Sequence, residues 1–215
     1  LITHYIGIDV SGMQQPEQRQ GRLLFIGRLV DKKGVDILLA AMRCLQQSDS
    51  KTVPGLDIAG SGPLEAELRA QAADLPSVQF LGWQTPDQLN RILHKAQAVV
   101  VPSRIAADGD CEGLPTVVLE SIRAGVPVVA SDHAGIPEII RHEETGFLVP
   151  ENDPDALAAA LLAASQAGDQ KRQMVVHAQQ RLQRDFNAAT QSQKLQQYLL
   201  GSVTADTAAS DYSVI

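Results

Sequence analysis

The chain has 215 residues, of which 44% are hydrophobic, and a formal net charge of −7 at pH 7. This length and composition suffice for one well-packed domain and leave little room for a second. The acidic balance argues against a general nucleic-acid-binding protein, because contacts to phosphates need a basic face. Two cysteines, Cys44 and Cys111, form no C-x-x-C pair, which is typical of a reducing compartment.

Short apolar runs alternate with helical patterns along the chain. Strands are expected at 23–26, 56–59, 78–81, 98–101, 127–130 and 147–149. Helices are expected near 35–47, 63–74, 86–95, 115–125, 135–141, 153–166, 170–184 and 191–200. Short strands without in–out alternation, each followed by a helix, predict a doubly wound parallel α/β sheet.

The pattern divides the chain into four parts. Residues 14–22 are polar and rich in turn formers, as expected of a linker that enters the first strand, and the linker is assigned to residues 1–20. The α/β domain is expected at 21–170, followed by C-terminal helices at 171–200. Residues 201–215 are rich in Ser, Thr, Ala and Asp and are expected to be disordered. Because the chain begins at Leu1 rather than Met, we expect it to be a fragment of a longer protein.

Two cations flank the loop after the first expected strand. Gly27 ends that strand, Arg28 follows it, and Lys33 lies five residues further on. In an open α/β sheet, ligands bind outside the carboxyl ends of the strands, so both cations are placed where a phosphate would be held. The alternative is that both are ordinary loop charges.

Two carboxylates, Glu112 and Glu120, surround a helix start in the segment EGLPTVVLE. Pro115 suits the first turn of a helix, and Gly113 lets main-chain amides approach a ligand closely. Free amides and the helix dipole would attract a diphosphate, and the two carboxylates would accept hydrogen bonds from hydroxyl groups. The alternative is a surface acid followed by another on an exposed helix face.

Six motifs in sequence resemble the group-1 (GT4-like) family of retaining glycosyltransferases with the GT-B architecture. They are GRLVDKKG (27–34), IAGSGPLEAEL (58–68), VQFLGW (78–83), AVVVPS (98–103), EGLPTVVLESIRAGVPVVAS (112–131) and AGIPEIIRHEETGFLVP (134–150). The resemblance implies the C-terminal, Rossmann-like, nucleotide-sugar-binding half of such an enzyme. DGDCEGLP and SDHAGIPE look most similar to bacterial exopolysaccharide transferases of the colanic-acid type.

The resemblance also implies roles for particular residues. Arg28, Lys33 and Glu112 would form the catalytic group, with the cations opposing charge on the leaving diphosphate and Glu112 binding donor-sugar hydroxyls. Glu120 would bind the ribose. The other expected donor-binding residues are Gly27, Gly62, Trp83, Gln84, Ser103, Gly113, Leu114, Pro115, Thr116 and Val117. For Gly62 the alternative is a tight strand-to-helix turn, and for Trp83 it is packing.

The implied ligand is a nucleotide-sugar carrying UDP or GDP rather than ADP, with no cofactor and no metal. The acceptor would be a glycan or a lipid-linked glycan bound through a missing N-terminal domain, so the fragment alone would be inactive. No apolar run approaches the roughly 20 residues of a membrane-spanning helix. The expected location is the cytoplasm, with peripheral association of the full protein at the inner membrane surface.

Two other functions remain open. The chain could be a non-catalytic nucleotide-sugar-binding module, or a GT-B-like epimerase acting on a sugar-nucleotide. A Rossmann dehydrogenase is disfavoured, because no G-x-G-x-x-G motif follows the first strand.

Overall fold

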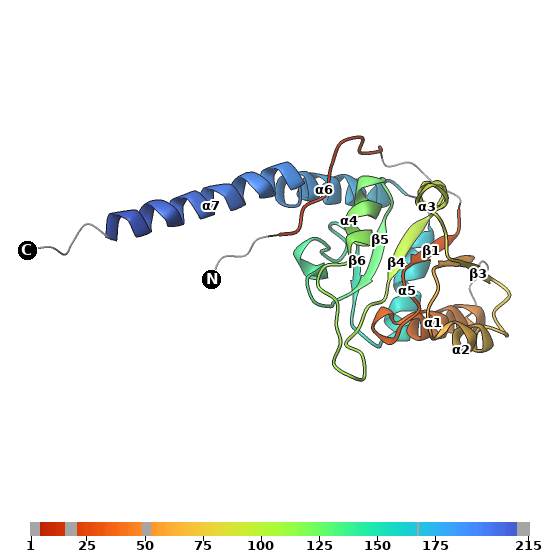
Figure 1. The fold of residues 1–215 in the computed structure, drawn as a ribbon. Coiled ribbons are helices and arrows are strands. Elements are labelled where there is room, and N and C mark those ends of the chain that lie inside the picture. Colours follow the sequence, from red (N-terminus) through yellow and green to blue (C-terminus); the bar gives the residue numbers. More distant parts are fainter. Residues whose placement is uncertain (1–4, 16–20, 49–52, 167, 210–215) are drawn as a thin grey trace, which may run out of the picture.

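A six-stranded parallel sheet forms the centre of the molecule (Figure 1). The computed structural model describes residues 5–15, 21–48, 53–166 and 168–209. The strands are β1 (Leu23–Ile26), β2 (Leu56–Ala59), β3 (Val78–Gly82), β4 (Ala98–Val101), β5 (Val128–Ser131) and β6 (Phe147–Val149), in the order β3-β2-β1-β4-β5-β6. The strand order reverses between β1 and β4, which is where open α/β sheets bind ligands at their carboxyl ends.

Helices cover both faces of the sheet, as the near-continuous apolar strands require. They are α1 (Val35–Gln47), α2 (Glu65–Gln71), α3 (Pro86–Leu93), α4 (Thr116–Arg123), α5 (Pro154–Ser165), α6 (Asp169–Asp185) and α7 (Ala188–Ala209), with the short 3-10 helices η1 (Asp31–Lys33) and η2 (Ile136–Glu138). One core cluster joins the sheet to α1 and α5, and a second joins it to α4 and α6. In β1, Phe25 belongs to the first cluster and Leu24 to the second, so a single strand contributes to both.

The doubly wound parallel sheet predicted from the sequence is therefore confirmed, and local signals explain several of its helix starts. The side chain of Asp153 accepts a hydrogen bond of 2.8 Å from the Ala156 amide and caps α5. Thr85 and Gln88 form a reciprocal capping box at the start of α3. At α4, Pro115 occupies the N-cap position, and the helix begins at Thr116.

The helix expected at 135–141 is wrong, because only the single 3-10 turn η2 forms there. The hydroxyl of Thr145 accepts a hydrogen bond of 2.7 Å from the Arg141 amide and donates one of 2.8 Å to the Ile139 carbonyl. A side chain thus takes main-chain groups that a longer helix would have paired internally.

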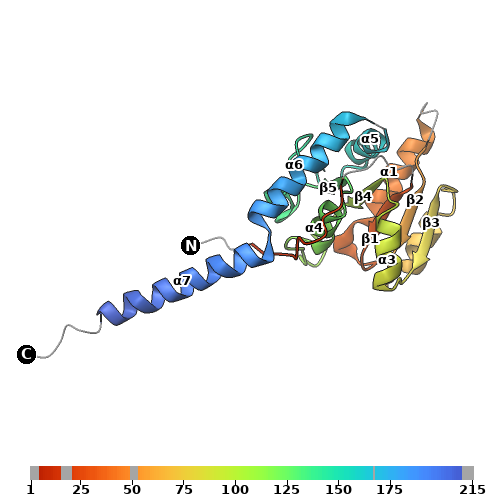
Figure 2. The ribbon, with the colours of Figure 1, turned by 90° about the horizontal axis from the view of Figure 1, so that it is seen from above.

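The disorder expected for residues 201–215 stays a prediction. Helix α7 continues through Gly201 to Ala209, while residues 210–215 lie outside the described part. The segment after Gly201 contains several alanines and no proline, and one internal glycine costs a helix only about 1 kcal/mol. In both ribbon views α7 extends away from the sheet (Figures 1 and 2).

The described part of the expected linker packs on the junction between α6 and α7. The Ile8 amide donates to the Phe186 carbonyl at 2.9 Å, and the Ala188 amide donates to the Ile8 carbonyl at 3.0 Å. The ring centroids of Tyr5 and Phe186 are 4.7 Å apart. Among the described residues, no helix combines the length and apolar character needed to cross a membrane.

Candidate functional site

The loops at the carboxyl ends of β1 and β2 are joined by main-chain hydrogen bonds. The Gly27 amide donates to Ala59, and the Leu29 amide donates to Ser61, each at 3.0 Å. A Cβ atom at Gly62 would lie 2.4 Å from the Leu29 carbonyl oxygen, so this glycine permits the close approach of the two loops. The contact supports the turn interpretation of Gly62, and its role in donor binding stays a prediction.

The structure brings Lys33 and Glu112 together, although they are 79 positions apart. Lys33 Nζ lies 3.0 Å from Glu112 Oε2, and these side chains are only 17% and 13% exposed. Lys32 Nζ lies 3.6 Å from Glu112 Oε1 and 2.9 Å from Asp110 Oδ2. Its hydrogen bond to Asp110 raises the pKa of Lys32. Two ammonium groups therefore surround one carboxylate at this edge of the sheet.

The turn that follows Lys32 and Lys33 depends on a glycine in the left-handed conformation. Gly34 has φ 61° where η1 ends and α1 begins. A Cβ atom there would lie 2.0 Å from the Pro102 carbonyl oxygen, so only glycine suits both the backbone angle and the contact with the chain after β4.

The start of α4 presents unpaired main-chain donors beside Glu112. Among the described residues, no acceptor is paired with the amides of Gly113, Leu114, Thr116 and Val117. A Cβ atom at Gly113 would meet nothing within 4 Å, so the backbone there is open to a ligand. Unpaired amides at a helix start favour an anion. Glu120 is exposed further along α4 and, within the described part, makes no ion pair with either predicted phosphate cation.

Arg28 lies at a neighbouring cavity of about 170 Å³. The cavity is lined by Ile26, Gly27, Arg28, Ala59, Gly60, Ser61, Trp83, Gln84 and Leu89. Trp83 is 69% exposed, so it does not belong to the core, and its role in donor binding stays a prediction. Gln84 Nε2 donates to the Leu81 carbonyl at 2.7 Å, which fixes this side chain in the wall of the cavity.

Ser103 follows β4 and differs from the other expected contacts. It is 0% exposed, and its hydroxyl has no hydrogen-bond partner among the described residues. Such burial leaves a ligand no access to the hydroxyl in this conformation, so its role as a donor contact stays a prediction. In the described part, no cluster of three or more His, Cys, Asp or Glu side chains could hold a metal ion.

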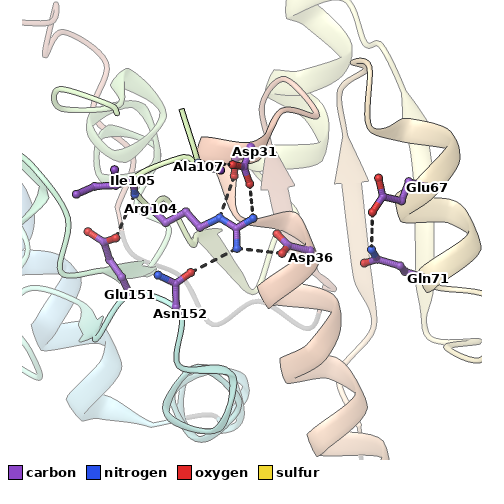
Figure 3. Close-up of polar contacts among 9 residues, drawn as sticks. All are labelled: Asp31, Asp36, Glu67, Gln71, Arg104, Ile105, Ala107, Glu151 and Asn152. Carbon is purple, nitrogen blue, oxygen red and sulfur yellow. Dashed lines mark hydrogen bonds and ion pairs between the residues drawn. The ribbon is translucent and has the colours of Figure 1, made fainter. Parts of the chain in front are cut away.

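A network around Arg104 was not predicted from the sequence (Figure 3). The guanidinium pairs with Asp31, lies 3.0 Å from Asp36 Oδ2 and donates to Asn152 Oδ1 at 3.4 Å. Asp31 also accepts from the Ala107 amide at 2.8 Å. Burial lowers the pKa of Arg104, but the contacts with Asp31 and Asp36 outweigh burial and raise it. The Ala107 amide, and then Arg104, lower the pKa of Asp31. The network ties η1, which carries Lys33, to the loops after β4 and β6.

A second unpredicted contact involves His133, which follows β5 and is 3% exposed. Its Nε2 lies 3.3 Å from the main-chain nitrogen of Glu112, and its Nδ1 lies 2.6 Å from Glu151 Oε1. Glu151 Oε2 also accepts from the Ile105 amide at 3.1 Å. No periodic pattern in the sequence marks either residue.

The sheet order, the flanking helices and the ligand-accessible edge define a Rossmann-like α/β domain of the kind found in GT-B enzymes. Residues 20–166 match the model of the protein family described as "Glycosyl transferases group 1". The chain belongs to this family.

Similar proteins are consistent with this assignment. The chain is 38% identical to the amylovoran biosynthesis glycosyltransferase AmsK of Erwinia amylovora over 169 residues, which cover 77% of this chain and 41% of that protein. It is 35% identical to the putative colanic acid biosynthesis glycosyltransferase WcaL of Escherichia coli K12 over 171 residues, with the same two coverages. The structure of HepE from Anabaena in complex with UDP-glucose has a TM-score of 0.75 at 21% identity, covering 92% of this chain and 57% of that one. The chain thus spans about two-fifths of the length of AmsK and WcaL.

Proposed function

We propose that this chain is the donor-binding domain of a retaining, GT4-type glycosyltransferase. The complete enzyme would transfer a sugar from a UDP- or GDP-sugar to a glycan or lipid-linked acceptor during exopolysaccharide biosynthesis. One observation carries the proposal: Lys33 pairs with Glu112, which directly precedes the unpaired amides at the start of α4, at the sheet edge where the strand order reverses between β1 and β4. The names of AmsK and WcaL support the exopolysaccharide assignment, and the HepE complex supports a nucleotide-sugar ligand.

Charge accounts for the proposed chemistry. As the bond between sugar and diphosphate breaks, negative charge accumulates on the leaving phosphate, and prearranged cations and amides stabilise that charge. Arg28, Lys33 and the amides of Leu114 and Thr116 would supply this stabilisation. No cofactor or metal is required by this scheme.

Glu112 would bind hydroxyls of the donor sugar. In the structure its carboxylate is paired with Lys33 at 3.0 Å. A donor phosphate would compete for the ammonium group, leaving carboxylate oxygens to accept from sugar hydroxyls. The same ion pair would thus keep both groups in position before the donor arrives.

The cavity beside Arg28 would receive the nucleoside. Trp83 offers an exposed aromatic face for stacking, and Gln84 lies in the cavity wall. Glu120, on α4, would accept hydrogen bonds from the ribose. The acceptor would bind to parts of the complete enzyme outside this chain, which by itself would bind the donor without transferring the sugar.

Ligand-induced stabilisation tests donor binding directly. A nucleotide present at 100 times its Kd raises the free energy of unfolding by about 2.7 kcal/mol, so the melting temperature rises measurably. We expect a rise with UDP, GDP or one of their sugars, and a much smaller rise in Lys33→Ala. Lys95→Ala is the matched control, since this exposed lysine lies beside Gly21 before the amino end of β1. The proposal is contradicted if no nucleotide in the panel shifts the wild-type melting temperature.

Retention of the anomeric configuration of the donor sugar is tested separately, with the complete enzyme. The proton NMR spectrum of the product should show the same anomeric configuration as the donor sugar. An inverted product contradicts the retaining assignment while leaving donor binding unaffected.

A further inference from the structure

His133 and Glu151 lie outside the predicted donor contacts but hold both ends of the loop that leads to Glu112. At one end, Glu151 Oε2 accepts a hydrogen bond of 3.1 Å from the Ile105 amide. At the other end, His133 Nε2 accepts a hydrogen bond of 3.3 Å from the Glu112 amide. His133 Nδ1 and Glu151 Oε1 are 2.6 Å apart, so one carboxylate fixes both ends of the loop, one directly and one through the imidazole.

These contacts define the proton positions. A main-chain N–H can only donate, so Nε2 of His133 must be the unprotonated acceptor. The ring proton therefore lies on Nδ1 and is donated to Glu151. Because His133 is 3% exposed, water cannot readily replace either partner.

The contacts act on Glu112 more than on the amides that follow it. The carbonyl of Gly113 accepts a separate hydrogen bond of 3.3 Å from the Gly135 amide. The next residues enter α4, whose helical geometry fixes the amides of Thr116 and Val117. Loss of the imidazole acceptor would therefore release the Glu112 backbone while the proposed phosphate-binding amides kept a separate support.

We propose that His133 and Glu151 are positioning residues for Glu112 and thereby set the preference of this site for a nucleotide-sugar over the bare nucleoside diphosphate. This inference rests on the proposed function, in which Glu112 contacts the sugar and the amides contact phosphate. Disturbing His133 should weaken binding of the sugar-bearing ligand selectively, whereas general damage to the domain would weaken both ligands alike.

The test measures affinities of the chain by calorimetry for two pairs of ligands, UDP with UDP-glucose and GDP with GDP-mannose. The pair that binds more tightly to the wild type is then used with His133→Phe, which retains a ring and removes both ring nitrogens. We expect a loss on the order of tenfold for the nucleotide-sugar and less than about threefold for the diphosphate. His133→Gln, whose amide oxygen can replace Nε2 as acceptor, should recover part of the loss.

His142→Phe is the matched control. His142 also accepts a main-chain hydrogen bond, from the Leu148 amide to Nδ1 at 3.2 Å, but it is exposed and makes no contact with Glu112. This variant should leave both affinities unchanged. Melting temperatures of all variants show whether each remains folded.

A wild-type measurement remains decisive if His133→Phe does not fold. Long-range nitrogen–proton NMR of the imidazole should identify the neutral tautomer with the proton on Nδ1. A proton on Nε2 at neutral pH overturns the inference, as does equal wild-type affinity for both members of the chosen pair, or equal losses for both in His133→Phe. If the wild type binds none of the four ligands, the proposed function itself fails, and the inference fails with it.

Discussion

Arg104 ties three loops together, so replacing it should reduce both stability and nucleotide affinity. In Arg104→Met the unbranched side chain is largely retained, while the contacts with Asp31, Asp36 and Asn152 are lost (Figure 3). Since η1 would lose one of its attachments, Lys33 should also be held less firmly near Glu112.

The magnitude follows from the exposure of the partners. An exposed ion pair contributes up to about 1 kcal/mol, whereas removing one partner of a fully buried pair costs about 3–5 kcal/mol. The Arg104 side chain is 17% exposed, but those of Asp31 and Asp36 are 38% and 35% exposed and can be rehydrated. We therefore expect Arg104→Met to lower the free energy of unfolding by about 1–2 kcal/mol.

Urea unfolding monitored by circular dichroism measures this change. Arg184→Met is the control, because Arg184 is 71% exposed and pairs only with its neighbour Asp185 among the described residues. That substitution should change the free energy of unfolding by less than about 0.5 kcal/mol. If Arg104→Met loses no more stability than this control, the contacts drawn in Figure 3 do not anchor the three loops.

Three further predictions address the backbone, the pH dependence and the cavity. Gly60→Ala should destabilise the domain by about 2 kcal/mol or more, because Gly60 has φ 145° and a Cβ atom there would lie 1.8 Å from the Gly27 carbonyl oxygen. Gly113→Ala, with open space around the added Cβ atom, should hardly change the stability measured by thermal unfolding, and equal losses in the two variants would contradict the prediction. The pKa of Asp31 is lowered in the folded state, so its stabilising contribution is complete above the unfolded-state pKa of about 3.9 and is lost as the pH falls through the folded-state pKa. The difference in free energy of unfolding between wild type and Asp31→Asn should therefore be smaller at about pH 3 than at about pH 6, and a constant difference would contradict a stabilising role of the ionised carboxylate. Trp83 is the single tryptophan and is 69% exposed at the cavity, so a bound nucleotide should quench the intrinsic fluorescence, and saturable binding without any change in emission would exclude stacking on this ring.

The architecture was predictable because it depends on signals that are local in the sequence. Buried strands appear as continuous apolar runs, and caps such as Asp153 mark where helices begin. The failure at 135–141 has a physical reason that lies beyond such patterns. Thr145 stops the helix expected there by taking main-chain groups several residues away.

The candidate site was predictable in part for a topological reason. Parallel strands place their carboxyl ends at one edge, so Lys33 and Glu112 could be assigned to the same place despite their separation in sequence. Arg104 and Asp31, which are 73 positions apart, appear in the sequence as ordinary loop charges. Their pairing depends on the relative placement of loops that periodicity does not determine, and the same holds for His133 and Glu151.

A crystal structure of this chain with UDP or GDP would locate the nucleotide. We expect the diphosphate to lie against the amides at the start of α4, within hydrogen-bond distance of Lys33 or Arg28, with the base over Trp83. A nucleotide bound elsewhere on the domain, with the Lys33–Glu112 pair and those amides untouched, would contradict the proposed function.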